Sequence, residues 1–379
     1  MSNLEEKPSE TWMECDAVAL RQEVAPAVEL IAAREVPLGG PRAMTVHRTL
    51  PSRQRTMIGA WCFADHYGPS LVSETGGMVV PPHPHTGLQT VSWLFEGEIE
   101  HRDSVGSHAF VRPGVLNLMT AGRGISHSEV STARTTSLHG VQLWVALPSA
   151  SRDTAPFFES HEAVRLRIGD AEVAVFVGEL GGASVGATTF SPLVAAEILL
   201  PAGGRAELPV RPDFEYGVLV DAGPVAVDGV TVARTELAYT GLGRERIVLG
   251  AGDEPVRVVL IGGVPLDEQI LMWWNFVGRS HEEIVAYRAQ WQRESGAPEP
   301  DDASAPLGRS AAAGGSAALG GSAALGASAA LGETSAEAAD PSHPESVVAL
   351  PRFGASDHHF EGSPLPAPAL PTVRLKPRP

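Results

Sequence analysis

Two short segments of this chain each place a pair of potential metal ligands two residues apart. The first is Pro82-His83-Pro84-His85, and the second is His127-Ser128-Glu129. Side chains at i and i+2 of a β-strand point to the same face of the sheet, so each pair can aim both groups at one point. Because this use of the spacing requires two strands side by side, the pairs constrain the fold strongly. They predict a divalent-metal site of three imidazoles and one carboxylate in a β-structure.

The donor set narrows the choice of metal. Imidazole and carboxylate suit divalent first-row ions, whereas zinc sites usually contain cysteine or only three protein ligands. Four nitrogen and oxygen ligands with one or two open positions favour Fe(II) or Mn, with Cu, Ni, Co and Zn also compatible. The alternative interpretation is that these are ordinary polar residues of loops or core. A second i, i+2 pair directly after the Gly-rich loop at 121–125 favours the metal site.

The surrounding sequence predicts short strands separated by turns. Strand-like runs such as 89–95 and 115–119 recur about every 8–12 residues with Gly or Pro turns between them, a pattern typical of barrels and sandwiches. The totals of 40 Gly and 31 Pro agree with many turns. A second β-rich region from about 140 to 263 resembles the first but contains a single histidine, His161. If both regions are barrels, only the first holds a metal site.

Composition divides the rest of the chain. Ser280 is positioned to cap a helix over 282–293, and Ser-Ala-Ala-Leu-Gly recurs at 316–320, 322–326 and 328–332. Such small, Gly-rich repeats cannot bury enough surface to fold alone and predict a flexible linker. The predicted organisation is an N-terminal segment (1–33), a metal-binding barrel (34–139), a metal-free barrel with its helix (140–294), a low-complexity linker (295–346) and a Pro-rich extended tail (347–379).

Charge and cysteine content limit the function classes. A net charge of −17 argues against a nucleic-acid-binding surface, which needs clustered Lys and Arg. Two cysteines, Cys15 and Cys62, do not form a disulfide framework and indicate a reducing compartment. The polar N-terminus does not read as a secretory signal, and no apolar run approaches the roughly 18 residues of a membrane span. We therefore expect a soluble cytoplasmic protein with no membrane or nucleic-acid partner.

Several other chemically interesting residues have plainer interpretations. The sequence favours solvated turn positions for His101, Asp103 and His108, and a buried apolar role for Cys62 rather than that of a nucleophile. Asp65 and His66 lie in a predicted turn, where they either hold the turn or orient a metal ligand. His358 and His359 in the tail are expected to be exposed and inert.

Longer motifs resemble the pirin family, whose members consist of two cupin barrels. The matching stretches are Gly59-Ala60-Trp61-Cys62-Phe63, Asp65-His66-Tyr67-Gly68-Pro69, His83-Pro84-His85, Glu100-His101-Arg102-Asp103-Ser104 and, longest, Met119-Thr120-Ala121-Gly122-Arg123-Gly124-Ile125-Ser126-His127-Ser128-Glu129. With Arg34-Glu35-Val36-Pro37-Leu38-Gly39-Gly40 and Asn275-Phe276-Val277-Gly278-Arg279, the resemblance covers about 34–292. It implies an iron site in the first barrel with His83, His85, His127 and Glu129 as ligands. One departure is Gln89, because the wider cupin pattern often places a Glu a few residues after His-x-His.

The resemblance implies two activities of different classes. Pirin-like proteins are similar to quercetin 2,3-dioxygenases, which open a flavonol ring with O2 and release carbon monoxide. In that case Glu129 is the candidate catalytic base for the flavonol 3-hydroxyl. The alternative is a non-catalytic regulator whose binding to protein partners follows the redox state of iron. A third option is another metal-dependent reaction on a small carbonyl or enol compound, since cupin barrels host many chemistries.

Overall fold

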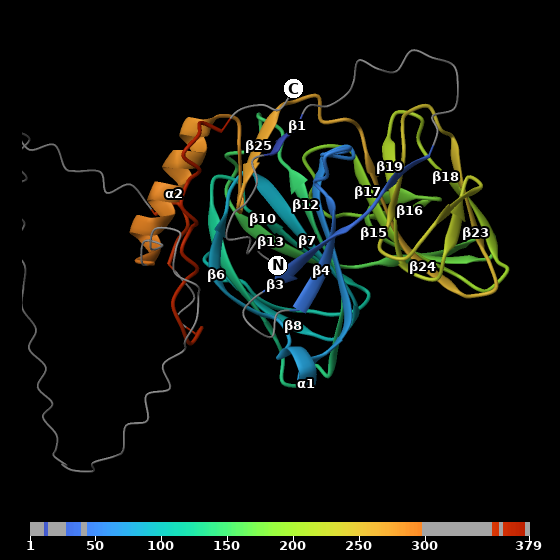
Figure 1. Cartoon of the computed structure of the whole chain (residues 1–379), viewed down its shortest axis with the longest axis horizontal. Helices are drawn as coiled ribbons and strands as arrows, with labels where there is room; N and C mark the ends of the chain where they lie inside the picture. Colours follow the sequence, from blue (N-terminus) through green and yellow to red (C-terminus); the bar gives the residue numbers. More distant parts are fainter. Residues whose placement is uncertain (1–10, 14–27, 39–43, 298–350, 356–358, 376–379) are drawn as a thin grey trace, which may run out of the picture. The chain divides into compact units, whose positions relative to one another are not determined.

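The structure is a computed structural model that describes residues 11–13, 28–38, 44–297, 351–355 and 359–375. Figure 1 shows that this part of the chain is mostly β-strand, with two helices, α1 (Val72–Thr75) and α2 (His281–Ser295). Two cupin-type barrels follow one another along the chain, which confirms the predicted all-β fold. Apart from 295–297, the predicted linker lies outside the described residues.

The first barrel consists of two antiparallel sheets. The seven-stranded sheet has the order β13-β10-β7-β12-β5-β4-β3, and the four-stranded sheet has the order β6-β11-β8-β9. The strands are β3 (Arg34–Leu38), β4 (Met44–Leu50), β5 (Trp61–Leu71), β6 (Val79–His85), β7 (Leu88–Glu96), β8 (Ile99–Asp103), β9 (His108–Val111), β10 (Val115–Thr120), β11 (Ile125–Ser131), β12 (Ser137–Ala146) and β13 (Phe157–Glu162).

The second barrel repeats this plan with a larger and a smaller sheet. The larger sheet runs β14-β15-β17-β24-β19-β22-β2, with β16 on β15, and the smaller runs β18-β23-β20-β21. Its strands are β2 (Glu29–Ile31), β14 (Val164–Ile168), β15 (Ala171–Leu180), β16 (Ala183–Val185), β17 (Leu193–Leu200), β18 (Arg205–Pro209), β19 (Glu215–Ala222), β20 (Val225–Val227), β21 (Val230–Val232), β22 (Leu237–Thr240), β23 (Arg246–Ala251) and β24 (Val256–Gly263).

The pairing of β12 and β13 indicates where the first barrel ends. β12 pairs with both β5 and β7 in the middle of the first barrel, and β13 pairs with β10 at its edge. The predicted division after residue 139 falls within β12. We therefore propose that the first barrel extends through β13. The N-terminal strand β2 pairs with β22, so the chain contributes to the second barrel before it builds the first.

A separate three-stranded sheet and the helix α2 complete the described fold. β1 (Thr11–Met13), β25 (Ile270–Trp273) and β26 (Phe276–Gly278) form the sheet, and α2 begins directly after it. Ser280 is the N-cap of α2, and its hydroxyl accepts a hydrogen bond of 3.2 Å from the backbone N–H of Glu283. This confirms the predicted helix and its cap. Among the described residues, none of the helices is long and apolar enough to cross a membrane.

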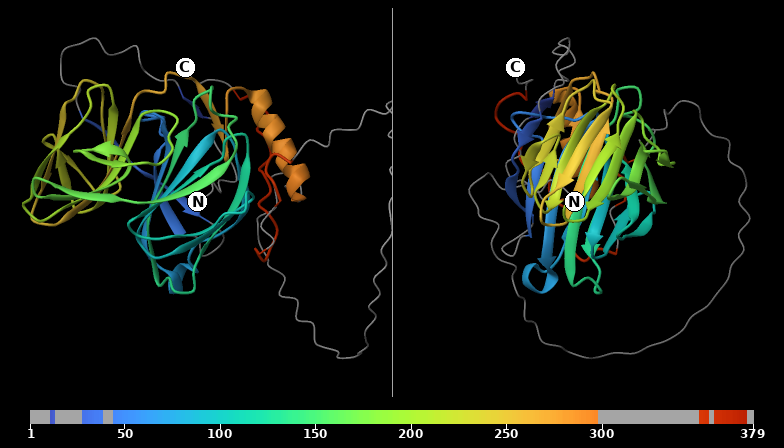
Figure 2. Two further views of the ribbon diagram at one scale, coloured as in Figure 1. Left: turned by 180° about the vertical axis from the view of Figure 1, so that it is seen from behind. Right: turned by 90° about the vertical axis from the view of Figure 1, so that its right-hand side faces the viewer.

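The C-terminal residues 351–355 and 359–375, here called the strap, pack against α2 (Figures 1 and 2). Phe353 is fully buried in an aromatic cluster with Trp291 and Phe276. The indole N–H of Trp291 donates to the carbonyl oxygen of Leu365 at 2.8 Å. The predicted extended tail is therefore docked on the body of the protein.

Candidate metal centre

The two His-containing segments lie on neighbouring strands of the first barrel. β6 and β11 pair antiparallel with His83 directly opposite His127 and His85 opposite Ile125. The three imidazoles consequently gather inside the barrel, with ring centroids 4.2 Å apart for His83 and His127 and 5.0 Å apart for His85 and either other ring. One nitrogen from each ring lies within 4.8 Å of the others. The Nε2 atoms of His85 and His127 are 3.1 Å apart.

Glu129 joins this cluster through His127. On its other side, β11 pairs with β8 in regular register, with His127 opposite Asp103 and Glu129 opposite His101. His101, His127 and Glu129 form a second group of potential ligand atoms within 4.8 Å, which shares His127 with the first. A register shift between β11 and β6 separates His127 from Glu129. The structure thus brings the three histidines together and places the carboxylate beside His127.

Burial keeps the imidazoles neutral. It lowers the pKa of His83 to about 3 and holds the pKa values of His85 and His127 well below their usual range. The Nδ1–H of His83 donates to the carbonyl oxygen of Pro81 at 2.8 Å, so its Nε2 carries the lone pair. That Nε2 is buried without a hydrogen-bond partner among the described residues. Neutral rings with an unshared, inward-facing nitrogen fit a bound divalent ion.

Aromatic side chains hold the rings in place. Trp144 on β12 meets His85 edge to face at 5.2 Å and stacks on Phe63 at 4.1 Å. Phe158 on β13 stacks on His101 at 4.7 Å. Since these contacts come from the larger sheet, both sheets of the barrel orient the imidazoles.

The structure corrects two predictions about polar residues. His101 and Asp103, expected at solvated turn positions, are only 3% and 8% exposed and lie in β8. Asp103 accepts hydrogen bonds from the backbone N–H groups of Val105 and Ser107. The reason is the strand period: Ile99, His101 and Asp103 share one face, and Ile99 is core. His108 is exposed, as predicted, but it lies in β9 rather than in a turn.

Asp65 and His66 differ from the prediction in the same way, because they lie within β5 rather than in a turn. Asp65 forms a buried two-point ion pair with Arg48, at 2.6 Å and 2.8 Å. His66 contacts Asp221 of the second barrel, with His66 Nε2 at 2.6 Å from Oδ1 of Asp221. Neither residue belongs to the group formed by His83, His85 and His127.

Two other sequence-based interpretations concern Cys62 and Gln89. Cys62 is buried, and burial raises the pKa of its thiol to about 12, which confirms a packing role. The side-chain amide of Gln89 donates to the Thr120 hydroxyl and to the carbonyl oxygen of Thr188, both at 2.9 Å. At the position where other cupins often have Glu, this chain therefore has a structural hydrogen bond.

Sequence reasoning missed Tyr67 on β5. Its hydroxyl is buried with no hydrogen-bond partner among the described residues. Burial, and then the nearby carboxylates of Glu129 and Asp65, raise the pKa of Tyr67 well above its ordinary value. Its place directly after the Asp65-His66 pair in one of the motifs is the only signal that could have found it. A neutral hydroxyl therefore lies close to the candidate carboxylate.

The strap reaches the strands that carry the ligands. Ser126, next to His127, donates its hydroxyl to the carbonyl oxygen of Phe353 at 3.0 Å. The backbone N–H of Leu365 donates to the carbonyl oxygen of Pro82, next to His83, at 2.8 Å. At Gly124, where φ is +152°, an added Cβ would lie 2.5 Å from Arg352. Glycine therefore permits the strap to approach the loop that leads to His127.

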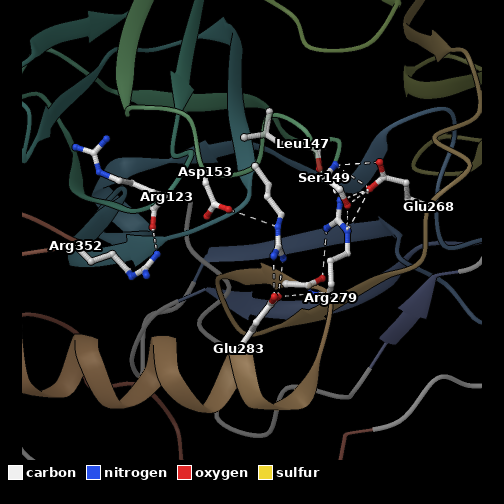
Figure 3. Close-up of polar contacts among 10 residues, drawn as sticks. Arg123, Leu147, Ser149, Asp153, Glu268, Arg279, Glu283 and Arg352 are labelled. Atoms are coloured by element: carbon white, nitrogen blue, oxygen red, sulfur yellow. Dashed lines mark hydrogen bonds and ion pairs between the residues drawn. The ribbon is translucent and has the colours of Figure 1, made fainter.

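Charged contacts fix α2 beside the same barrel, as Figure 3 shows. Arg152 pairs with both oxygens of Glu283 at 2.7 Å and 2.8 Å. Arg279, at the end of one of the recognised motifs, donates to Glu268 at 2.7 Å and to the carbonyl oxygen of Leu147 at 2.8 Å. The motif thus serves to attach α2 to the loop after β12.

Two domain models match the chain, "Pirin" over residues 43–145 and "Pirin C-terminal cupin domain" over residues 195–295. A Pseudomonas aeruginosa protein named "putative quercetin 2,3-dioxygenase" is 42% identical over 77% of this chain and 91% of its own length. Human pirin is 33% identical over 54% of this chain and 73% of its own length.

The likeness extends to three dimensions. The crystal structure of a quercetin 2,3-dioxygenase from Acinetobacter baumannii superposes with a TM-score of 0.73 at 31% identity, covering 92% of this chain and 98% of that one. The domain matches span strands of both barrels, and the first includes β6 and β11 with their histidines. On these grounds the chain belongs to the pirin family.

Proposed function

We propose that this protein is a metal-dependent oxygenase that opens a flavonol-like ring with O2, in the manner of quercetin 2,3-dioxygenase. The observation that carries the proposal is the group of three neutral, buried imidazoles facing one another in the first barrel. The names of its relatives in Pseudomonas and Acinetobacter point to the same reaction.

The proposed ligands are His83, His85, His127 and Glu129. Two ring nitrogens 3.1 Å apart, those of His85 and His127, repel if both carry lone pairs and nothing lies between them. A shared ion removes that repulsion. Imidazole and carboxylate donors suit Fe(II), with Mn, Cu, Ni, Co and Zn compatible with the same set. When bound, the ion supplies a Lewis acid and a template for the oxygens of the flavonol.

We assign to Glu129 the role of the general base that accepts the proton of the flavonol 3-hydroxyl. Its carboxylate is 1% exposed and lies beside His127 on β11. In this step the O–H bond breaks, the proton passes to a carboxylate oxygen, and the electron pair stays on the substrate oxygen. The resulting flavonolate is electron-rich and more reactive toward O2 than the neutral flavonol. The buried surroundings of Glu129 exclude water that would otherwise solvate this charge.

Neighbouring residues position these groups. Trp144 fixes the ring of His85, and Pro81 fixes the tautomer of His83 through its carbonyl oxygen. The Tyr67 hydroxyl, kept neutral by burial and by the nearby carboxylates, remains a potential hydrogen-bond donor close to Glu129. These side chains hold the ligands in one geometry before any substrate binds.

The test is oxygen uptake by Fe(II)-reconstituted protein with quercetin. Uptake is expected in the parent protein, and His127→Ala should lower both iron content and turnover to background. Glu129→Gln should lower turnover by at least about 100-fold, the lower end of the usual contribution of a general base, which is about 10²–10⁴. His108→Ala, an exposed histidine on β9, is the matched control and should behave like the parent.

The outcomes separate the candidate functions. Full turnover by Glu129→Gln would remove the role given to that residue. No uptake by fully iron-loaded parent protein would contradict the oxygenase, and the redox-responsive regulator would then be tested by comparing partner affinity in the Fe(II) and Fe(III) states. Carbon monoxide release distinguishes ring opening from simple oxidation of quercetin.

A further inference from the structure

A second histidine cluster lies outside the candidate metal centre. It contains His66 on β5, His139 on β12 and Asp221 on β19, so two residues come from the first barrel and one from the second. All three are buried, with exposures of 0%, 7% and 1%. Their potential ligand atoms lie within 4.8 Å of one another.

The geometry of the cluster converges on one oxygen atom. Nε2 of His66 lies 2.6 Å and Nε2 of His139 lies 2.5 Å from Oδ1 of Asp221. The other oxygen, Oδ2, accepts a hydrogen bond of 3.1 Å from Arg257. Arg257 therefore fixes the carboxylate so that Oδ1 faces both imidazoles. Ligating carboxylates in metal sites are usually held by such an outer hydrogen bond.

The negative and positive side chains near the cluster balance one another. Arg257 also pairs with Glu197 at 3.2 Å, and Arg234 donates to the backbone carbonyl oxygens of Asp221 at 2.8 Å and Gly68 at 2.7 Å. Two carboxylates thus face two guanidinium groups. Burial lowers the pKa of His66, which favours its neutral, metal-binding form. A cation entering here would not meet an excess of fixed positive charge.

An opening leads to the cluster from outside. A cavity of about 710 Å³ is lined by His139, Asp221 and Arg234, together with His47, Ser70 and Thr75. His66 lies behind them and is fully buried. An ion with its waters could therefore reach His139 and Asp221 from the cavity, and one coordination position would stay open toward it.

We propose that His66, His139 and Asp221 form a second metal site, which takes a divalent first-row ion such as Zn²⁺ and joins the two barrels. Two imidazoles and one carboxylate with a water in the fourth position make a tetrahedral site of the kind zinc adopts. Zinc bonds of about 2.0–2.1 Å separate tetrahedral ligand atoms by about 3.3 Å. Each neutral imidazole must therefore carry its proton on Nδ1 instead of Nε2, which leaves the Nε2 lone pair for the ion, and must withdraw from Oδ1 by about 0.7 Å. The cavity gives His139 room for this movement.

This site is independent of the proposed oxygenase activity. Its residues differ from those of the first cluster, and its contacts hold the barrels together rather than facing the interior of one of them. The competing interpretation is a purely hydrogen-bonded cluster, in which protons occupy the place of the ion. The experiment below distinguishes the two.

The test uses the full-length chain with the first cluster disabled by His83→Ala and His127→Ala. We expect this protein to bind one equivalent of Zn²⁺ in equilibrium dialysis with elemental analysis. Adding His139→Ala should abolish the binding of this equivalent. If the protein with His139→Ala does not fold, the nearly isosteric Asp221→Asn replaces it and should have the same effect. Arg257→Met should weaken Zn²⁺ binding by about 10- to 100-fold, as loss of an outer hydrogen bond does in other sites. Adding His108→Ala instead should leave the equivalent in place.

Location is decided by crystals of the parent protein soaked in Zn²⁺. An anomalous scattering peak within bonding distance of Nε2 of both His66 and His139 is the expected result. The absence of a peak there would overturn the proposal. So would a His83→Ala/His127→Ala protein that folds natively but binds no zinc, or an Asp221→Asn protein that still binds the equivalent of zinc.

Discussion

The two barrels share a plan, but different side chains fill them. The core of the second barrel is apolar and consists mostly of Ala, Val and Ile, such as Val173, Val194 and Val218. Residues 164–263 contain no histidine. The first barrel instead buries six imidazoles, the carboxylate of Glu129 and a charged Arg48–Asp65 pair.

This difference shows how polar groups in the interior of a barrel affect its stability. The apolar core of the second barrel stabilises it without a need for polar partners, although Glu215 and Asp221 are buried at its boundary with the first barrel. Polar groups in the first barrel stabilise it only while each has a partner, because an unpaired buried charge or lone pair is costly. The stability of the first barrel should therefore depend more strongly on pH, on metal and on single partners than that of the second. All seven tryptophans lie outside 164–263, so their fluorescence reports mainly on the first barrel and the α2 region, although Trp61 and Trp93 also contact residues of the second barrel.

The largest expected effect is acid destabilisation of the metal-free first barrel. The pKa of His83 falls from 6.5 to about 3 on burial, so unfolding takes up a proton at any pH between these values. The free energy of unfolding is then highest above pH 6.5 and decreases by about 1.4 kcal/mol per pH unit below it. His83 alone should account for about 5 kcal/mol by pH 3. Urea titrations of chelator-treated protein, followed by tryptophan fluorescence, measure the slope.

His83→Gln is the matched variant for this prediction, because it keeps a polar side chain that does not titrate. Its free energy of unfolding should fall less steeply with decreasing pH, by about 1.4 kcal/mol for each unit. Equal slopes for parent and variant would show that His83 is not the group responsible.

The next effect concerns the buried ion pair between Arg48 and Asp65, whose side chains are 2% and 0% exposed. Arg48→Met should reduce the free energy of unfolding by about 3–5 kcal/mol, because it leaves the Asp65 carboxylate buried without its two-point partner. The double variant Arg48→Met/Asp65→Leu should recover most of that loss. Chemical denaturation of the three proteins gives the comparison. A double variant no better than Arg48→Met would mean that packing, not charge, causes the loss.

The third prediction concerns the strap, which contacts the first barrel. Phe353→Ala removes a fully buried ring from the cluster with Trp291 and should cost about 3 kcal/mol. It should also weaken metal binding, since the backbone of Phe353 accepts the hydrogen bond from Ser126 beside His127. Val373→Ala, 64% exposed on the same strap, should change stability by less than about 0.5 kcal/mol. Thermal unfolding and metal titration of both variants test the claim.

The histidine cluster of the first barrel could be predicted because its signal is local. His83 and His85, like His127 and Glu129, lie two positions apart with one residue between them, and in a strand that spacing puts both side chains on one face. The same rule applied to Ile99, His101 and Asp103 would have predicted burial for the two polar residues. The turn interpretation failed because it weighed residue type above alternation with the core residue Ile99.

The contacts between barrels could not be predicted in this way. His66, His139 and Asp221 are far apart in sequence, and Asp221 belongs to a different barrel. No local period relates them, so only the tertiary fold shows that they meet. The assignment of β12 is similar, because an apolar run such as 143–147 does not reveal which strands it pairs with. The alternation of polar and apolar residues predicts which face of a strand is buried. Which distant strands pair with one another depends on the fold of the whole chain.

The smallest effect concerns the boundary between the barrels. Glu215 of β19 accepts a hydrogen bond of 2.8 Å from the backbone N–H of Gly59 and one of 2.7 Å from the hydroxyl of Tyr239. Glu215→Gln keeps the shape but loses the charge, so both bonds weaken and the cost should be about 1–2 kcal/mol. Tyr239→Phe removes one of the two partners.

A double-mutant cycle separates the two contributions. If Glu215 acts through Tyr239, the combined variant should lose less than the sum of the single losses, with a coupling of about 1 kcal/mol. If it acts mainly through Gly59 of the first barrel, the losses should add. Additive losses together with a lower midpoint for tryptophan fluorescence would show that a residue of the second barrel stabilises the first. Loss confined to the second barrel would show instead that the two interiors, different in content, are also independent in stability.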